Sequence, residues 1–215
     1  MSNEWIKTNW YCIRHAVVAE HTHKGTFYGS QDVDCTPCND LSKWNANNLP
    51  NEDNVLITSK LKRTIQTANA IKEAGAILPE QIEIPEFNEQ CFGVWENKPF
   101  KDVYKETDEV FWFAPAHTVI EQGESFMNLY GRTAHRMHQL THKYAGKNII
   151  SVTHGGTIRA MIAFAMDLAM DNALNITIDN QSITLLEHFH KKESKEKGKW
   201  RVRFINKLPI ESLDI

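Results

Sequence analysis

The sequence predicts a three-layer α/β/α fold, with a mostly parallel central sheet, helices on both faces and an inserted helical cap. Three short apolar runs support this prediction, because each is followed by turn residues and then by a helical pattern: Trp10–Ile13, Val55–Thr58 and Ile149–Thr153. Continuous apolar runs are typical of strands buried on both faces, and their alternation with helices is typical of parallel sheets. The 41% of hydrophobic residues suffices for a packed core.

The first two runs lie in the N-terminal half of the chain. Trp10–Ile13 ends in the pair Arg14-His15. Val55–Thr58 continues into Ser59 and then into a helical pattern from about Lys60 to Ala74, which a glycine closes. Both predicted strands are therefore followed directly by polar or cationic side chains.

The third run, Ile149–Thr153, leads into His154-Gly155-Gly156 and a helix that extends to about Met166. Upstream of it, an amphipathic helix is predicted to begin near Ser125, because serine is favoured as the N-cap of a helix. Apolar and small side chains recur there at helical spacing. They are Phe126, Leu129, Tyr130, Thr133, Met137, Leu140 and Tyr144.

Three features complete the predicted architecture. Two strand-like segments, Ser182–Glu187 and Trp200–Phe204, flank the charged run 190–199, which we interpret as a solvated hairpin connection. The aromatic-rich segment 98–122 is expected to form the inserted helical cap with a long loop. Because no internal repeat or Gly/Ser/Pro-rich linker divides the chain, we expect a single domain over residues 1–215.

Composition limits the classes of partner and the compartment. With 24 Lys and Arg against 27 Asp and Glu, the formal net charge is −3, which argues against nucleic-acid and membrane partners. The N-terminus has no apolar leader, and the apolar stretch 160–166 is too short to cross a bilayer. Four cysteines do not resemble a disulfide framework, so we expect a cytoplasmic protein. The pair Cys35 and Cys38 has redox or zinc spacing but no second pair, and we expect its role to be structural or incidental. The sequence does not indicate an oligomeric state.

The ends of the predicted strands suggest a site. In parallel α/β sheets, ligands bind at the carboxyl ends of the strands. These ends carry Arg14 and His15, Ser59 with Arg63 one turn into its helix, and His154. Two histidines and two arginines would meet at one edge, and guanidinium groups bind phosphoryl oxygens in pairs. Backbone N–H groups at the start of the following helix also favour a phosphate, so we predict a phosphate site there.

A site that cleaves a phosphate ester also needs a proton donor for the leaving alcohol. The segment 87–96 offers two carboxyl groups, Glu89 and Glu96. Residue type alone does not decide between them.

Five motifs follow one another along the chain. They are Arg14-His15-Ala16, Ser59-x-x-x-Arg63-x-x-Gln66-Thr67-Ala68, Glu89-x-x-Phe92-Gly93-x-Trp95-Glu96, Gly123-Glu124-Ser125 and Thr153-His154-Gly155-Gly156-x-Ile158-Arg159. In this order they resemble the histidine phosphatase superfamily, in the branch related to cofactor-dependent phosphoglycerate mutases. The resemblance covers residues 11 to about 187, which is most of the chain.

The resemblance implies a role for each matching residue. His15 would be the nucleophile and would become phosphohistidine. Arg14, Arg63 and His154 would hold the phosphoryl oxygens, and Glu89 would first protonate the leaving oxygen and then accept a proton from water. The arginines would supply the positive charge, so the resemblance implies neither a metal ion nor a cofactor.

The residue after the second histidine separates branches of this superfamily. In the acid-phosphatase and phytase branch it is an aspartate that serves as the acid, whereas here it is Gly155. The acid must then come from elsewhere, which favours Glu89 over Glu96, because the family pattern places the latter away from the phosphate. The backbone of Gly155 is expected to contribute to substrate binding.

The chain departs from the family pattern at three places. Ala16 stands where the family usually has glycine, which is acceptable at negative φ. His21 stands where the family often has a phosphate-binding asparagine, and we hypothesise that it takes over that role; His23 or a solvent-facing position for His21 are the alternatives. The segment Asp32–Pro37 is distorted, so substrate contacts there are not assigned.

The segment Glu89–Glu96 resembles phosphatase members such as alpha-ribazole phosphatase and fructose-2,6-bisphosphatase. The resemblance therefore implies a phosphatase that acts on a small phosphorylated metabolite. Two alternatives remain open, namely a phosphoglycerate-mutase-type phosphotransferase and a catalytically weak phosphate-binding regulatory module. His135, His138 and His142 share one predicted helix face, which we interpret as a half-exposed surface and not as a metal site.

Overall fold

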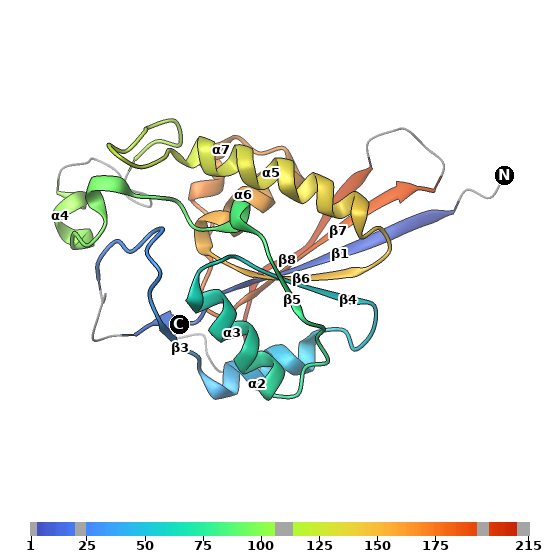
Figure 1. Cartoon of the computed structure of the whole chain (residues 1–215). Helices are drawn as coiled ribbons and strands as arrows, with labels where there is room; N and C mark the ends of the chain where they lie inside the picture. Colours follow the sequence, from blue (N-terminus) through green and yellow to red (C-terminus); the bar gives the residue numbers. More distant parts are fainter. Residues whose placement is uncertain (1–3, 20–24, 106–113, 193–197, 210–215) are drawn as a thin grey trace.

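A six-stranded sheet forms the centre of the protein (Figure 1). The structure is a computed structural model that describes residues 4–19, 25–105, 114–192 and 198–209. Across the sheet, the strands lie in the order β5 (Gln81–Glu83), β4 (Asn54–Thr58), β6 (Asn148–Thr153), β1 (Trp5–Arg14), β7 (Ile183–Lys191) and β8 (Lys199–Lys207). A two-stranded sheet pairs β2 (Val17–Val18) with β3 (Cys35–Thr36).

The strand directions confirm the α/β prediction. Strands β5, β4, β6 and β1 pair in parallel, whereas β7 is antiparallel to β1 and β8 is antiparallel to β7. The hairpin predicted near the C-terminus is this β7–β8 pair. Its strands are longer than predicted, because His188 pairs with Trp200 and Phe189 pairs with Lys199. The ends of the charged run 190–199 therefore belong to the sheet.

Helices cover both faces of the sheet (Figure 1). On one side lie α2 (Asn39–Asn48) and α3 (Lys62–Glu73), and on the other lie α5 (Phe126–Lys143), α6 (Gly155–Met166) and the short α7 (Met170–Leu174). The side chains of the central strands alternate between these faces. Trp10 and Ile149 pack toward α5 and α6, while Ile13 and Ile150 pack toward α2 and α3. Burial on both faces is what the continuous apolar runs predicted.

The predicted start of the long amphipathic helix is confirmed. Ser125 is the N-cap of α5, and its hydroxyl accepts a hydrogen bond from the backbone N–H of Asn128. The Asn128 side chain accepts one from the Ser125 backbone in return, which completes a capping box. In the segment between α3 and α5 lie the one-turn helices η1 (Pro85–Phe87) and η2 (Gly93–Trp95) and the short α4 (Phe100–Tyr104). In the described part of the chain, no helix is long and apolar enough to cross a membrane.

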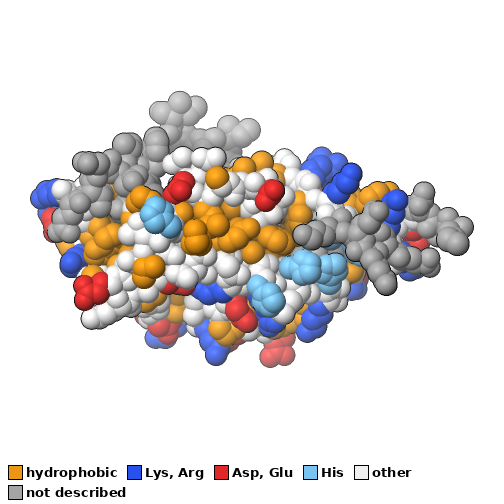
Figure 2. Space-filling model, turned by 90° about the horizontal axis from the view of Figure 1, so that it is seen from above, with side chains coloured by type: hydrophobic (Ala, Val, Ile, Leu, Met, Phe, Trp, Pro, Cys, Tyr) orange, Lys and Arg blue, Asp and Glu red, His pale blue; other side chains and the backbone are white. Residues whose placement is uncertain are grey.

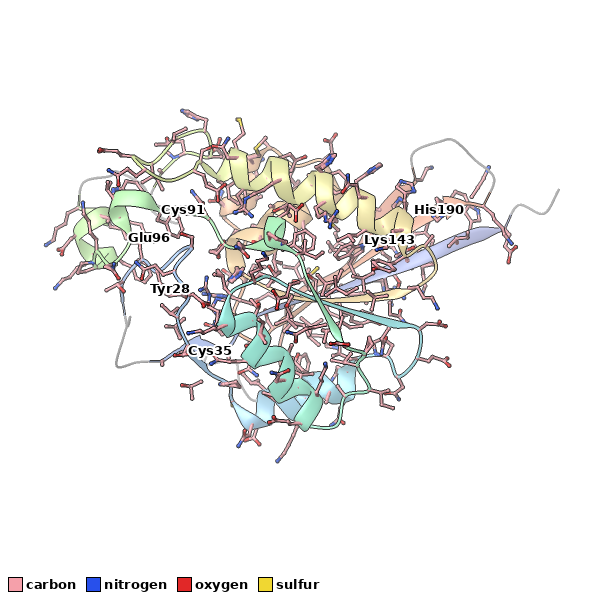
Figure 3. The ribbon with its side chains drawn as sticks, in the orientation of Figure 1. Tyr28, Cys35, Cys91, Glu96, Lys143 and His190 are labelled. Carbon is pink, nitrogen blue, oxygen red and sulfur yellow. The ribbon has the colours of Figure 1, made fainter. Side chains whose placement is uncertain are left out.

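The molecule has two chemically different ends. Figure 3 labels Tyr28, Cys91 and Glu96 toward the end where β1, β4 and β6 finish, and His190 with Lys143 toward the other end. Seen from the side of α5, the surface in Figure 2 shows pale-blue histidine side chains gathered near that second end.

Candidate active site

The ends of β1, β4 and β6 bring the predicted site residues together. His15 follows β1, and its backbone N–H donates a hydrogen bond to the carbonyl of Thr153, the last residue of β6. The rings of His15 and His154 have centroids 5.2 Å apart in an edge-on arrangement. The convergence results from the parallel pairing of β1 with β6, which aligns Arg14 with Thr153.

His15 is held in a single tautomer. Its side chain is 1% exposed, and Nδ1 lies 2.6 Å from the carbonyl oxygen of Ala16. A carbonyl can only accept, so the proton is on Nδ1 and the lone pair is on Nε2. Burial, with Arg63 and Arg14 nearby, holds the pKa of His15 well below its usual 6.5. The ring is therefore neutral at neutral pH and keeps a lone pair on Nε2.

Neighbouring backbone contacts fix the turn that carries His15. The Ala16 N–H donates to Thr67 Oγ1 at 2.9 Å, and Asn180 Nδ2 donates to the His15 carbonyl at 2.7 Å. Ala16 is not among the described residues with positive φ, so alanine fits where the family usually has glycine. Asn180 was not predicted, because a single asparagine in a loop carries no sequence signal.

Two arginines lie beside the histidines. Arg63, in the first turn of α3, is fully buried and donates from its terminal nitrogens to the carbonyls of Gln31 and Gly29 at 2.6 and 2.7 Å. Arg14 donates from one terminal nitrogen to the carbonyl of Ile178 at 2.5 Å. The Nε atoms of both arginines are buried, and no acceptor among the described residues bonds them. Buried donors of this kind fit an anionic ligand.

His154 is the N-cap residue of α6 and is fully buried. Its Nε2 lies 2.9 Å from Ser59 Oγ at the end of β4, while its Nδ1 has no partner among the described residues. Burial, followed by Arg63, lowers the pKa of His154 well below 6.5. The N–H groups of the first turn of α6 add partial positive charge at the same place.

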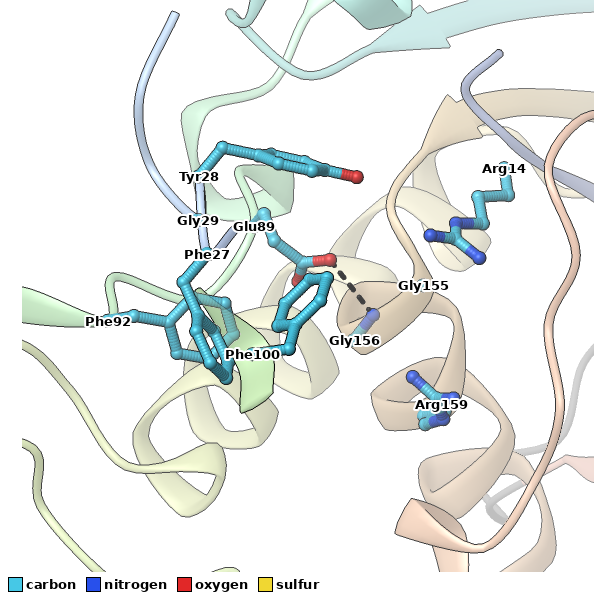
Figure 4. A pocket seen from close by; sticks show the side chains of 10 residues that line it. All are labelled: Arg14, Phe27, Tyr28, Gly29, Glu89, Phe92, Phe100, Gly155, Gly156 and Arg159. Carbon is cyan, nitrogen blue, oxygen red and sulfur yellow. Dashed lines mark hydrogen bonds between the residues drawn. The ribbon is translucent and has the colours of Figure 1, made fainter. Parts of the chain in front are cut away.

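Glu89 meets this helix start directly (Figure 4). Its Oε2 accepts from the N–H of Gly156 at 3.1 Å, and its Oε1 accepts from the N–H of Gln90 at 3.0 Å. A Cβ on Gly156 would lie 2.4 Å from Glu89 Oε1, so glycine is what allows the carboxylate to approach. Figure 4 shows the carboxylate pointing toward the cavity between Tyr28 and Arg14.

Glu96, the rival candidate acid, has a different environment. Its Oε1 accepts from the backbone N–H and the hydroxyl of Ser30, each at 2.9 Å, and from the N–H of Phe92 at 3.2 Å. These contacts join the segment around Ser30 to the segment around Phe92. Glu96 therefore holds two loop segments together, whereas Glu89 lies beside the start of α6.

The cavity has a volume of about 120 Å³. The surrounding side chains are aromatic on one side and cationic on the other (Figure 4). Arg159 points into it beside Arg14; burial, followed by Arg14, lowers its pKa to about 10. The aromatic wall was not predicted, because Phe27 and Tyr28 lie in a loop without periodicity. The complete lining is Arg14, Phe27, Tyr28, Gly29, Glu89, Phe92, Phe100, Gly155, Gly156 and Arg159.

Arg132 of α5 supports the loop that carries Glu89. Its terminal nitrogens donate to the carbonyls of Glu86, Asn88 and Glu89 at 2.6, 2.8 and 3.2 Å. Its Nε and Nη2 also donate to the two carboxylate oxygens of Glu124, at 3.2 and 2.6 Å. Glu124 was predicted only as part of a motif. Arg132 was not predicted at all, because an arginine on a helix usually faces solvent.

The remaining sequence predictions have mixed outcomes. The structure brings together Arg14, His15, Arg63, Glu89, His154 and Gly155 as predicted. His21 and His23, and the phosphate contact hypothesised for them, lie outside the described residues. Cys35 and Cys38 are free thiols, and Cys35 Sγ donates to the Arg63 carbonyl at 3.3 Å.

Comparisons with known proteins identify the family of the chain and its similar structures. A model of the family described as "Histidine phosphatase superfamily (branch 1)" matches residues 10–201. A relative from Hydrogenobacter thermophilus, whose name includes the words "phosphoserine phosphatase 2", is 28% identical over 81% of this chain and 86% of its own. The adenosylcobalamin/alpha-ribazole phosphatase of Escherichia coli is 28% identical over 58% of this chain and 62% of its own. The solved structure of a mycobacterial glucosyl-3-phosphoglycerate phosphatase superposes with a TM-score of 0.77 at 20% identity, covering 93% of this chain and 99% of that one.

Proposed function

Because the chain belongs to the histidine phosphatase superfamily, we propose that it hydrolyses phosphomonoesters of small metabolites through a phosphohistidine intermediate. One observation carries the mechanism. His15 is buried as the neutral Nδ1–H tautomer, between arginines whose Nε donors have no acceptor among the described residues. This combination offers a lone pair for attack on phosphorus and donors for the phosphoryl oxygens.

In the first step, Nε2 of His15 attacks phosphorus in line with the ester oxygen. The N–P bond forms as the P–O bond to the alcohol breaks, and Glu89 in its acid form gives its proton to the leaving oxygen. Arg14, Arg63 and the α6 start with its cap His154 stabilise the charge on the phosphoryl oxygens. The product alcohol leaves, and phosphohistidine remains.

In the second step, water attacks the phosphohistidine. Glu89, now a carboxylate, takes one proton from the water as the new O–P bond forms and the N–P bond breaks. Inorganic phosphate is released, and both His15 and Glu89 return to their starting forms. The residue that donated a proton in one step thus accepts one in the next.

The cavity favours a compact, doubly anionic substrate. Arg159 lies beside Arg14 in the lining, so a second guanidinium faces the space next to the phosphate position. A carboxylate on the alcohol would complement it. Some relatives are named as phosphoserine phosphatases, which agrees with this chemistry. O-phosphoserine and O-phosphoethanolamine differ only in a carboxylate, so we expect higher kcat/KM for the former, with the difference reduced in Arg159→Gln.

The central test is replacement of the nucleophile. His15→Ala should lower turnover of p-nitrophenyl phosphate by at least about a thousandfold. His135→Ala, which removes an exposed histidine of α5, serves as the matched control and should retain full activity. Rapid acid-free quenching of wild type with labelled phosphoserine should trap label on His15. Full activity of His15→Ala, or label on another residue, would refute the proposal.

A further inference from the structure

Four histidines from two elements meet at the end of the sheet opposite His15. His138 and His142 lie one turn apart on α5, and His188 and His190 lie two residues apart on β7. On a helix and on a strand, these spacings place each pair on one face. In the sheet, His188 pairs with Thr8 and His190 with Ile6, in the half of β1 remote from the active site. We define these four residues as the histidine cluster.

The rings of the histidine cluster are close to one another. His138 Nε2 and His142 Nε2 lie 3.2 Å apart, and the two ring centroids are separated by 4.6 Å. The His142 ring lies 6.1 Å from each of the rings of His188 and His190. The last two are stacked 5.5 Å apart. His142 therefore lies between His138, its partner in the helix pair, and the strand pair of His188 and His190.

These separations match those of imidazoles that share one metal ion. Zn²⁺ binds imidazole nitrogen at about 2.0–2.1 Å, which puts two tetrahedral ligand nitrogens about 3.3 Å apart. At the tetrahedral angle the same bond length puts two ring centroids about 5 Å apart. The measured ring separations of the histidine cluster, 4.6 to 6.1 Å, lie on both sides of this value, so small ring movements would bring them to it.

A second observation also indicates a ligand. The Nδ1 atoms of His188 and His190 are buried and have no hydrogen-bond partner among the described residues. His188 as a whole is 4% exposed, so this nitrogen is screened from water. A buried imidazole nitrogen without a partner loses the hydrogen bonds that water would provide, and a metal ion offers it a bond instead.

A groove lined by Asp167 and Lys199 adjoins His138, His142 and His188 and gives access from solvent. Figure 2 shows histidine side chains at the surface toward this end of the molecule, and Figure 3 places His190 toward the same end.

We propose that the histidine cluster binds one transition-metal ion of the imidazole-preferring class, with Zn²⁺ as the probe, and that the ion joins the end of α5 to β7. His138 and His142 form the paired part of the site. In the described residues, no three metal-ligating side chains already surround a common point, so a ring of His188 or His190 turns to complete the ligand set. The site lies away from His15, which makes its role structural and not catalytic.

The test is zinc titration of the full chain without a polyhistidine tag, after treatment with a chelator and desalting. Calorimetry of the wild type with ZnCl₂ at pH 7.5 should show one site, and thermal denaturation should show a midpoint that rises by several degrees with saturating Zn²⁺. His138→Ala/His142→Ala should weaken binding at least tenfold and abolish the midpoint shift. These two side chains are exposed, so their removal leaves the core intact.

Two controls assign the site. His135→Ala lies on the same helix and pairs with Gln139, so it should bind Zn²⁺ as tightly as the wild type. Cys35→Ser/Cys38→Ser removes the other metal-like pair and should also leave binding unchanged. The proposal is overturned if the wild type binds no Zn²⁺, if His138→Ala/His142→Ala binds it unchanged, or if the cysteine variant loses it.

Discussion

The protonation of His15 is set by its surroundings and leads to a prediction about pH. Burial is the main cause that lowers the pKa of His15 in the folded protein. Just below pH 6.5, a histidine in the unfolded chain is protonated, whereas His15 in the folded protein stays neutral. The proposed nucleophile therefore stays available as the pH falls through 6.5. We expect the acid limb of kcat/KM to lie below pH 6.5, measured with a substrate whose own phosphate ionisation is known and corrected for.

The lowered histidine pKa values also make the stability of the folded protein depend on pH. His15 and His154 both have lowered pKa values, so lowering the pH below 6.5 favours the unfolded chain, which takes up protons that the folded protein excludes. NMR of ¹⁵N-labelled histidine provides a direct check, because His15 should show the neutral Nδ1–H form at pH 6. A His15 ring that is cationic at pH 6 would contradict both statements.

The carboxylate of Glu89 leads to a prediction that depends on the leaving group. General acid catalysis typically contributes about 10²–10⁴-fold, and it matters most when the leaving alcohol is a poor one. Glu89→Gln should lower kcat/KM, which reports the first step, by about that factor on phosphoserine and far less on p-nitrophenyl phosphate, whose phenolate leaves without a proton. Rate measurements on the two substrates provide the comparison.

Glu96→Gln is the matched control for that experiment. It keeps the size of the side chain and weakens the contacts to Ser30 and Phe92, so its effect should be on stability and equal on both substrates. A substrate-dependent loss in Glu96→Gln, with none in Glu89→Gln, would exchange the roles of the two residues.

At the scale of the element, α5 carries several separate tasks. Its start is fixed by the capping box at Ser125, its middle holds the Glu89 loop through Arg132, and its end carries His138 and His142. Ser125→Ala removes the cap and should lower the free energy of unfolding by about 1 kcal/mol. Urea denaturation measures this change. An unaltered midpoint would show that the cap hydrogen bond is replaced by another donor or acceptor.

Gly131, in the same helix, offers a substitution that should stabilise the protein. It lies exposed in the middle of α5 with negative φ, and a Cβ there would meet nothing within 4 Å. Glycine within a helix costs about 0.5–1 kcal/mol relative to alanine. Gly131→Ala should therefore raise the free energy of unfolding by about that amount, with kcat unchanged. A lower urea midpoint in this variant would mean that α5 needs the glycine for a contact outside the described residues.

The helix α2 was not predicted, and its composition explains why. Four asparagines in its ten residues lower its intrinsic helix propensity, and its N-cap Cys38 makes no side-chain cap. Tertiary contacts hold it instead. Buried Asn45 donates to the Gln181 carbonyl, and the Cys38 N–H donates to the Gln181 side chain. Such contacts between distant segments leave no periodic signal in the sequence.

For the whole molecule, residues at strand ends were predictable from the apolar pattern, whereas the role of Glu89 on its loop followed only from the family resemblance, and the other loop residues of the cavity were not predicted. Buried strands are legible as apolar runs, and parallel pairing then places the residues after each strand at one edge, so Arg14, His15 and His154 could be predicted together. Tyr28 and Arg159 in the cavity lining depend on how loops and a helix turn toward the site. From the sequence, His138 and His142 were interpreted as part of a half-exposed helix face and not as a metal site, because His188 and His190 join them only through tertiary packing.

The position of β1 has a consequence for how the chain folds as it is made. β1 is synthesised before its partners β6 and β7, which lie far along the chain, with Asn9 beside both Asn148 and Glu187. Pairings between segments so distant in sequence form slowly, and an unpaired apolar strand is prone to aggregate. This strand therefore emerges from the ribosome long before its neighbours are synthesised. Nascent chains stalled with β7 still in the exit tunnel should be digested by protease, whereas released full-length chains should resist; a protected core in the stalled chains would contradict this.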